Sequence, residues 1–190
     1  MNRRLAPTLV KGTVLASVAL LGMKAYAAGK AAASDLATVS RLDLPRYMGT
    51  WYEIARYPNR FERKCAGFTT ATYTAMPGGR VKVENRCRLD DGSTDVAAAV
   101  ARQAGPAGSP RLKVRFAPAL LSFVPAVWAD YWVIDLDRDY QLAAVSEPGR
   151  DYLWILSRSP KVEKPALDAL LARLSGQGFD PRRLVYTRQE

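Results

Sequence analysis

Few residues of this chain belong to the types that carry out catalytic chemistry. The 190 residues include two cysteines, Cys65 and Cys87, and no histidine. The lack of histidine excludes Ser-His-Asp and Cys-His mechanisms, histidine-based zinc sites and the commonest general base. Phosphate-loop, nucleophile-elbow and dinucleotide-binding glycine motifs are also missing. The composition therefore favours a binding protein over an enzyme. It leaves a free Cys65 thiol as the one plausible nucleophile of an alternative, isomerase-like activity.

Three acidic residues, Asp135, Asp137 and Asp139, have the spacing that opens a calcium-binding loop. The sixth position of such a loop needs glycine and the twelfth needs glutamate, whereas this chain has Tyr140 and Ser146 there. The segment is therefore interpreted as a solvated hairpin turn. Neither a metal site nor a cofactor is predicted.

Glu53 is a carboxylate inside a segment with the pattern of a β-strand. Gly49 lets the chain enter the strand, and Trp51 supplies a large aromatic side chain at the first inward position. Strict alternation places Trp51, Glu53 and Ala55 on one face and Tyr52, Ile54 and Arg56 on the other. Glu53 is thus expected inside, either at the head group of a ligand or as a satisfied core acid.

The two cysteines could form a disulfide, because export would place them in an oxidising compartment. The strand register makes the bridge awkward. If Pro77–Arg80 is a hairpin turn, Cys87 sits opposite Thr70, and the chain before Phe68 must double back to bring Cys65 close. The bridge and two separate thiols both stay open at this point.

The N-terminal segment has the features of a secretory signal. Arg3 and Arg4 precede an apolar run over residues 12–23, and Ala25-Tyr26-Ala27 has the small-x-small pattern of a cleavage site. This run is short for a transmembrane helix, which needs about 20 residues. We expect cleavage after residue 27 and a linker over residues 28–40, with an uncleaved membrane anchor as the alternative. No cysteine near the cleavage point could carry an acyl anchor.

The chain is basic, with a formal net charge of +10. Removal of residues 1–27 takes away four basic residues and no acid, which lowers the net charge to +6. Such a surface could favour anionic membrane faces or serve only for solubility. Nucleic acid is not expected as a partner, because the charges are scattered singly.

Eight alternating or aromatic-rich segments follow one another at hairpin spacing, which predicts an all-β, up-and-down antiparallel barrel. The expected strands are residues 49–56, 68–76, 80–89, 94–103, 111–116, 130–136, 140–146 and 151–158. Leucines at helical spacing then predict a helix over residues 165–175 with one apolar stripe, packed outside the barrel. Residues 184–187 are expected to form a last short strand.

Three separated segments give the chain a resemblance to a known family. They are Gly49-x-Trp51 in the first strand, Asp130-Tyr131 at the start of the sixth, and Arg158 at the end of the eighth. Together they resemble the lipocalin family, and most of all its bacterial branch, over residues 41–190. The resemblance implies a calycin barrel that binds small hydrophobic ligands. The chain departs from the bacterial lipoproteins in lacking a lipobox cysteine, which makes the periplasm the expected location, with or without outer-membrane association.

Topology supports the resemblance, since Trp51 begins the first strand and Arg158 ends the eighth. Barrel closure brings these two ends together, and a guanidinium over an indole face contributes about 1–2 kcal/mol. Gly49, Trp51 and Arg158 are therefore expected to be structural residues that close one end of the barrel.

The connections at residues 59–66, 90–93, 118–129 and 147–150 are expected at the opposite, open end. Apolar rim residues are predicted in one of them: Leu120, Leu121, Phe123 and Trp128. An exposed apolar rim indicates ligand access, membrane contact or a dimer face. The alternative is that the segment folds inward as part of the core.

The predicted function is the binding, storage or transport of fatty acids or lysophospholipids for maintenance of the bacterial envelope, without a chemical step. The ligand class rests on the resemblance. The candidates for the cavity wall are Glu53, Phe68, Tyr73, Phe116, Tyr131, Trp132, Tyr152 and Trp154. Only about half of the aromatic candidates can point inward. Tyr152 and Trp154 are favoured over Leu153 and Ile155, because they lie on the same face of the expected strand as Arg158. The rivals are the Cys65-dependent enzyme and a module that docks a membrane or a partner subunit through residues 118–129.

Overall fold

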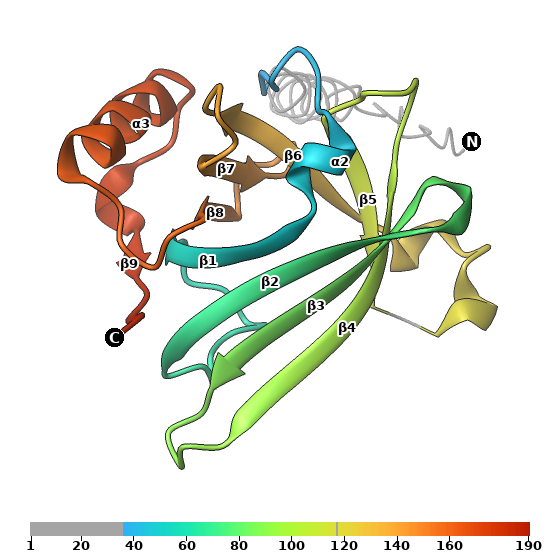
Figure 1. The fold of residues 1–190 in the computed structure, drawn as a ribbon, viewed down its shortest axis with the longest axis horizontal. Helices are drawn as coiled ribbons and strands as arrows, with labels where there is room; N and C mark the ends of the chain where they lie inside the picture. The colour runs from blue at the N-terminus through green and yellow to red at the C-terminus, as the bar shows by residue number, and fades with distance from the viewer. Residues whose placement is uncertain (1–35, 117) are drawn as a thin grey trace, which may run out of the picture. The chain divides into compact units, whose positions relative to one another are not determined.

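The computed structural model describes residues 36–116 and 118–190, and its core is a closed antiparallel β-barrel. Neighbouring strands pair in chain order from β2 to β8, and β1 closes the barrel by pairing with both β8 and β2. The strands are β1 (Gly49–Arg56), β2 (Gly67–Met76), β3 (Arg80–Arg88), β4 (Thr94–Gln103), β5 (Arg111–Arg115), β6 (Ala129–Leu136), β7 (Leu142–Ser146) and β8 (Leu153–Ser157). The predicted eight-stranded up-and-down barrel is confirmed (Figure 1).

One end of the barrel is closed by the segment that leads into β1. The short helix α2 (Leu44–Tyr47) begins at Asp43, whose side chain accepts a hydrogen bond from the Arg46 amide. Tyr47 points from this helix into the barrel and is fully buried. The interior of the barrel therefore contains an aromatic side chain that comes from this helix and not from a strand.

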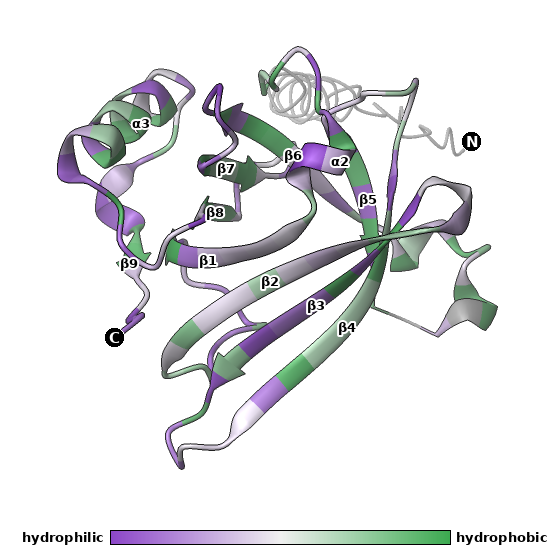
Figure 2. Cartoon of the chain, in the orientation of Figure 1, coloured by the Kyte–Doolittle hydropathy of each residue, from purple (hydrophilic) through white to green (hydrophobic). Residues whose placement is uncertain are grey.

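A second apolar layer lies outside the barrel, beneath helix α3 (Lys164–Gly176). Leu170 and Leu174 are fully buried against outward-facing side chains of β1, β7 and β8, among them Ala55, Ala144 and Ile155. These strands therefore have apolar residues on both faces, and Figure 2 shows β7 and β8 coloured as hydrophobic along most of their length. The helix predicted to pack on the outside is confirmed.

The predicted alternation of β1 is wrong at the end of the strand. A β-bulge between Glu53 and Ala55 shifts the pairing with β8 by one residue. Ala55 consequently joins the outer layer with Ile54, and Arg56 pairs with the inward-facing Trp154. A bulge reverses the faces of all residues that follow it. Arg56 thus reaches the same side as Glu53.

The C-terminal segment fills the place where β1 and β2 separate. β1 pairs with β2 only from Gly49 to Tyr52, and its end pairs instead with β9 (Val185–Tyr186). The amide of Phe68 donates to the carbonyl of Arg188 at 2.6 Å. The side chain of Gln189 donates to the backbone carbonyls of both Glu53 and Thr69. The tail therefore joins the two strands where they no longer pair with each other.

Cys65 and Cys87 are joined by a disulfide. The predicted register is wrong by one residue, because Thr70 pairs with Arg86 and not with Cys87. A β-bulge between Gly67 and Thr70, with Phe68 at φ 55°, shifts the pairing by one residue, so that Gly67 pairs with Arg88. The chain before Gly67 stays beside β3, and Cys65 bonds to Cys87 there.

The expected signal segment 1–27 lies outside the described residues, as do residues 28–35 of the expected linker. Within the part of the chain that the structure describes, no helix combines the length and apolar character needed to cross a membrane.

Candidate functional site

The closed end of the barrel is organised around Arg158 and Trp51. The guanidinium carbon of Arg158 lies 4.0 Å from the centre of the Trp51 ring. Its nitrogens donate to the backbone carbonyls of Arg46, Met48, Thr50 and Tyr140 at 2.7–3.4 Å. The cation–π contact and the hydrogen bonds together fasten β8 to the start of β1. Gly49 belongs to the same contact, because a Cβ on it would lie 3.2 Å from the guanidinium.

Three buried tyrosine hydroxyls meet just inside this end. The Tyr131 hydroxyl lies 2.8 Å from the Tyr47 hydroxyl and 2.8 Å from the Tyr73 hydroxyl. Burial raises the pKa of all three phenols, that of Tyr73 to about 12. They are therefore neutral hydrogen-bonding groups at any physiological pH. Tyr73 and Tyr131 were predicted for the wall, whereas Tyr47 precedes the first strand and no strand periodicity could indicate it.

The middle of the barrel is lined mainly by small and aliphatic side chains, with one polar exception. The inward residues here include Ala71, Val83, Ala99, Ala101, Ala143, Val145 and Leu156. Asn85 follows Val81 and Val83 at the same parity on β3, and its buried side-chain oxygen has no hydrogen-bond partner among the described residues. The sequence analysis did not select Asn85, although alternation on β3 marks it as the polar member of an otherwise apolar face.

Charged residues gather at the open end of the interior. Arg56 is paired with Glu62 at 2.6 Å and lies 3.3 Å from Glu53. Trp154 donates its indole N–H to Glu62 at 3.0 Å, and the Thr187 hydroxyl donates to Glu53. The bulge in β1 and the C-terminal tail bring these groups together, so linear sequence patterns do not indicate Arg56, Glu62 or Thr187.

Glu53 is the most perturbed acid of this group. It is only 3% exposed, and burial, followed by the charge of Glu62, raises its pKa from 4.5 to about 8. The Thr187 hydroxyl and the Arg56 charge act in the opposite direction. Glu53 is therefore protonated at neutral pH, and its neutral carboxyl group is a hydrogen-bonding wall residue.

The connection between β1 and β2 ties two sides of the open end together. Glu62 reaches Arg56 and Trp154 on the side of β1 and β8. Three residues further on, Cys65 is bonded to the inward-facing Cys87 of β3, and Lys64 is paired with Asp95 of β4 at 2.9 Å. The connection is thereby held from both sides of the open end.

The predicted wall residues fall into two groups. Glu53, Tyr73, Tyr131 and Trp154 lie on the inner side, and Tyr152 stacks on Trp154 with ring centres 5.7 Å apart. Phe68 lies outside this group, between the guanidinium groups of Arg88 and Arg188.

Trp132 and Phe116 also differ from the expectation. Trp132 packs with the outer layer, because Tyr131 takes the inward position on β6. Phe116 is 55% exposed, one residue beyond the end of β5. About half of the aromatic candidates thus lie in the interior of the barrel.

The apolar connection between β5 and β6 protrudes from the barrel (Figure 1). Leu120 and Phe123 are 72% and 79% exposed, while Leu121 and Trp128 are half-buried. Trp128 lies against the guanidinium groups of Arg102 and Arg115, at 4.5 and 5.3 Å. Residues 118–129 therefore do not fold inward as part of the core.

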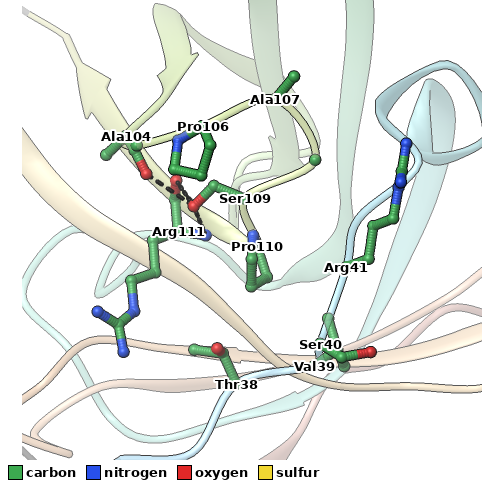
Figure 3. A pocket seen from close by; sticks show the side chains of 12 residues that line it. Thr38, Val39, Ser40, Arg41, Ala104, Pro106, Ala107, Ser109, Pro110 and Arg111 are labelled. Atoms are coloured by element: carbon green, nitrogen blue, oxygen red, sulfur yellow. Dashed lines mark hydrogen bonds between the residues drawn. The ribbon is translucent and has the colours of Figure 1, made fainter.

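A separate hollow of about 600 Å³ lies on the outside of the closed end, between residues 38–41 and 104–111 (Figure 3). Arg41 and Arg111 stand on different sides of it. The Ser109 hydroxyl inside it already donates to the Ala104 carbonyl at 2.6 Å. The candidate site is therefore the barrel interior and not this hollow.

The chain is similar to known proteins over most of its length. A family profile described as a Lipocalin-like domain matches residues 42–189. Temperature-induced lipocalin-1 of Arabidopsis thaliana is 39% identical over 157 residues, which are 82% of this chain and 83% of that protein. Outer membrane lipoprotein Blc of Escherichia coli K12 is 38% identical over 152 residues, 80% of this chain and 81% of that protein.

More distant similarities agree with these. Apolipoprotein D of Mus musculus is 27% identical over 153 residues, which are 77% of each chain. The crystal structure of insecticyanin from Manduca sexta has a TM-score of 0.62, with 20% identity over 81% of this chain and 84% of that chain. At this identity the structural match speaks for the fold alone.

Proposed function

Because the chain belongs to the lipocalin family, we propose that it binds, stores or transports small hydrophobic lipids, namely fatty acids or lysophospholipids, in the bacterial cell envelope, where it supports membrane maintenance. The observation that carries the proposal is the closed eight-stranded barrel with an apolar inner wall and polar groups at both ends. Barrels of this size hold one small ligand.

The energetics allow useful affinity. Burial of an acyl chain of about 15 methylenes at about 0.8 kcal/mol each gives roughly 12 kcal/mol before the costs of association. After several kcal/mol for lost freedom of motion, a micromolar or lower dissociation constant remains. Hydrocarbon burial is thus sufficient to hold a lipid without a covalent step.

The periplasm is the proposed location. The N-terminal pattern favours export, and a similar protein carries the name outer membrane lipoprotein. The cysteines of this chain stand at positions 65 and 87, far from the expected cleavage point. We propose that any association with the outer membrane is peripheral.

The structure also bears on the enzymatic alternative. Cys65 is bonded to Cys87, and the described residues contain no free cysteine. The nucleophile on which an isomerase-like activity depended is therefore absent from the folded protein.

The decisive experiment is native mass spectrometry of the mature protein purified from its own periplasm, followed by lipid extraction. We expect an acyl lipid near one per barrel. A barrel that is empty, and whose tryptophan fluorescence does not respond to added palmitic acid or lysophosphatidylcholine, would refute the proposal.

A second candidate function is peripheral contact of residues 118–129 with an anionic membrane surface. It is favoured by the exposure of Leu120 and Phe123, and Phe123 shares a shallow hollow with Arg102 and with Lys113, which is paired with Asp130. We expect Leu120→Asp to reduce co-sedimentation with phosphatidylglycerol vesicles at least fivefold while leaving lipid affinity unchanged. Val185→Asp, on the side of β9, is the matched control. Equal co-sedimentation of wild type and Leu120→Asp would rule out this contact.

A further inference from the structure

We propose that the tyrosine cluster of Tyr47, Tyr73 and Tyr131 is the binding site for the carboxylate of a free fatty acid, which lies in the barrel with its carboxyl end at the closed end. This inference rests on the proposed function. It adds which of the proposed lipids the interior selects and in which direction the lipid lies.

The first argument is a count of hydrogen-bond donors. Three hydroxyl groups own three hydrogens, and two hydrogen bonds join the cluster. No other hydrogen bond of these hydroxyls is found among the described residues. Whichever way the bonds run, one buried hydroxyl hydrogen stays available. A buried donor without an acceptor is unfavourable, so this position is suited to an acceptor group of the ligand.

The second argument is the charge behind the cluster. In the described part of the chain, Arg158 is paired with no carboxylate, and its hydrogen bonds go to backbone carbonyls. Its positive charge acts on Tyr47 and Tyr73, and it opposes the rise of their pKa values caused by burial. The Trp51 ring lies against the guanidinium, so the arginine acts through its field and not as a direct ligand. Arg158 is only partly buried, and its positive charge without a carboxylate partner favours an anion nearby.

The open end has the opposite character. Arg56 is already paired with Glu62, and Lys64 with Asp95. Glu53 adds a further acidic group beside Arg56. A carboxylate placed there would meet the charged Glu62 and a cation that this acid already neutralises, because Glu53 beside them is neutral. The difference between the two ends therefore sets the direction of the ligand.

The inner wall between the two ends is apolar and includes small side chains, which suits an acyl chain. Four alanines face inward on three different strands: Ala71, Ala99, Ala101 and Ala143. A lysophospholipid has no free carboxylate for the cluster, and its large head group would have to pass through the barrel to reach the closed end. We therefore expect a preference for free fatty acids over lysophospholipids.

The first test compares ligands on the wild-type protein. Palmitic acid, methyl palmitate and lysophosphatidylcholine compete with the fluorescent probe 1-N-phenylnaphthylamine at pH 7. We expect the acid to bind at least tenfold more tightly than the ester or the lysolipid. Equal affinities would overturn the inference and leave the proposed function intact. A failure of the probe and of every lipid to bind would refute the proposed function itself.

The second test measures direction. Stearic acids labelled with an anthroyloxy group at carbon 2 or at carbon 16 are bound to the protein and exposed to iodide. We expect the label at carbon 16 to be bound and readily quenched, because the methyl end lies at the mouth, and the label at carbon 2 to bind at least tenfold more weakly. The reverse pattern would show that the carboxylate lies at the mouth.

The third test uses variants. The triple variant Tyr47→Phe/Tyr73→Phe/Tyr131→Phe removes every hydroxyl of the cluster, and we expect its affinity for palmitic acid to fall at least tenfold while its affinity for methyl palmitate stays the same. The exposed Tyr186→Phe is the control and should change neither. Parallel losses for acid and ester would mean that the cluster serves packing alone, and would overturn the inference.

Discussion

At the scale of single residues, the acid Glu53 is the most informative group in the barrel. Burial would normally be avoided for a carboxyl group, yet this one faces the interior among Arg56, Glu62 and Thr187. The burial disfavours its charged form, and its pKa is raised to about 8. Its protonation is therefore coupled to the stability of the folded protein.

The sign of this coupling gives a testable pH dependence. Because the folded-state pKa of about 8 lies above the ordinary value of 4.5, the folded state holds the proton more tightly than the unfolded state. The stabilisation is complete below about pH 4.5 and is lost as the pH rises to about 8. We expect the melting temperature of wild type to fall between pH 5 and pH 8.5.

The matching variant is Glu53→Gln, which is neutral at every pH. Its melting temperature should change less over this range and exceed that of wild type at pH 9. The exposed Glu163→Gln should behave as wild type. Identical slopes for wild type and Glu53→Gln would contradict the assignment.

At the scale of elements, the C-terminal tail completes the barrel wall. It lies against the end of β1 and the start of β2, where those two strands do not pair with each other. Gly67 makes the close approach possible, since a Cβ at this position would lie 2.7 Å from the Arg188 carbonyl oxygen. The last residues of the chain therefore have a structural role at the mouth.

Substitution of Gly67 tests this role. Gly67→Ala should lower the free energy of unfolding by about 2 kcal/mol or more, because overpacking against a backbone atom adds to the backbone strain. Gly79→Ala is the control, since it also has a positive φ but no atom within 4 Å of the added Cβ. Urea denaturation compares the two, and equal losses would mean that the tail is not packed on Gly67.

The connection from β1 to β2 is the second element with a defined task. Its disulfide joins two cysteines that are 22 positions apart in the sequence. Because the bond restricts the unfolded chain, it stabilises the folded protein by about 3 kcal/mol. We expect the double variant Cys65→Ser/Cys87→Ser to lose about this much stability and to be cut by protease within residues 59–66. A reductant should reproduce both effects in wild type and change nothing in the variant. Resistance of the reduced protein to cleavage would show that Glu62 holds the connection alone.

At the scale of the whole molecule, binding of a lipid in the barrel interior is coupled to the stability of the folded protein. A lipid that binds only the folded protein stabilises it by mass action, by about 2.7 kcal/mol at a free concentration 100 times the dissociation constant. We expect palmitic acid to raise the melting temperature in proportion to the logarithm of its concentration, and calorimetry can measure the slope. No shift at saturating palmitic acid would contradict binding in the interior.

Alternation, turn residues and leucine spacing were sufficient to predict the eight strands and the outer helix, whereas Trp51 and Arg158 were predicted to close the barrel from the family resemblance. These signals are local, because the side-chain period of a strand and the residues of a turn are properties of short segments. The inward parity of Trp154 on β8 was predicted for the same reason. The start and end of each strand differ from the prediction by at most two residues.

The contacts of the site could not be read from such signals. Three features depend on contacts between segments far apart in the chain: the bulge that turns Arg56 inward, the bulge at Phe68 near the disulfide, and the tail that places Thr187 on Glu53. The outward position of Trp132 likewise depends on which face of β6 meets the outer layer. Such features follow from packing between segments far apart in the chain, and local periodicity carries no information about them.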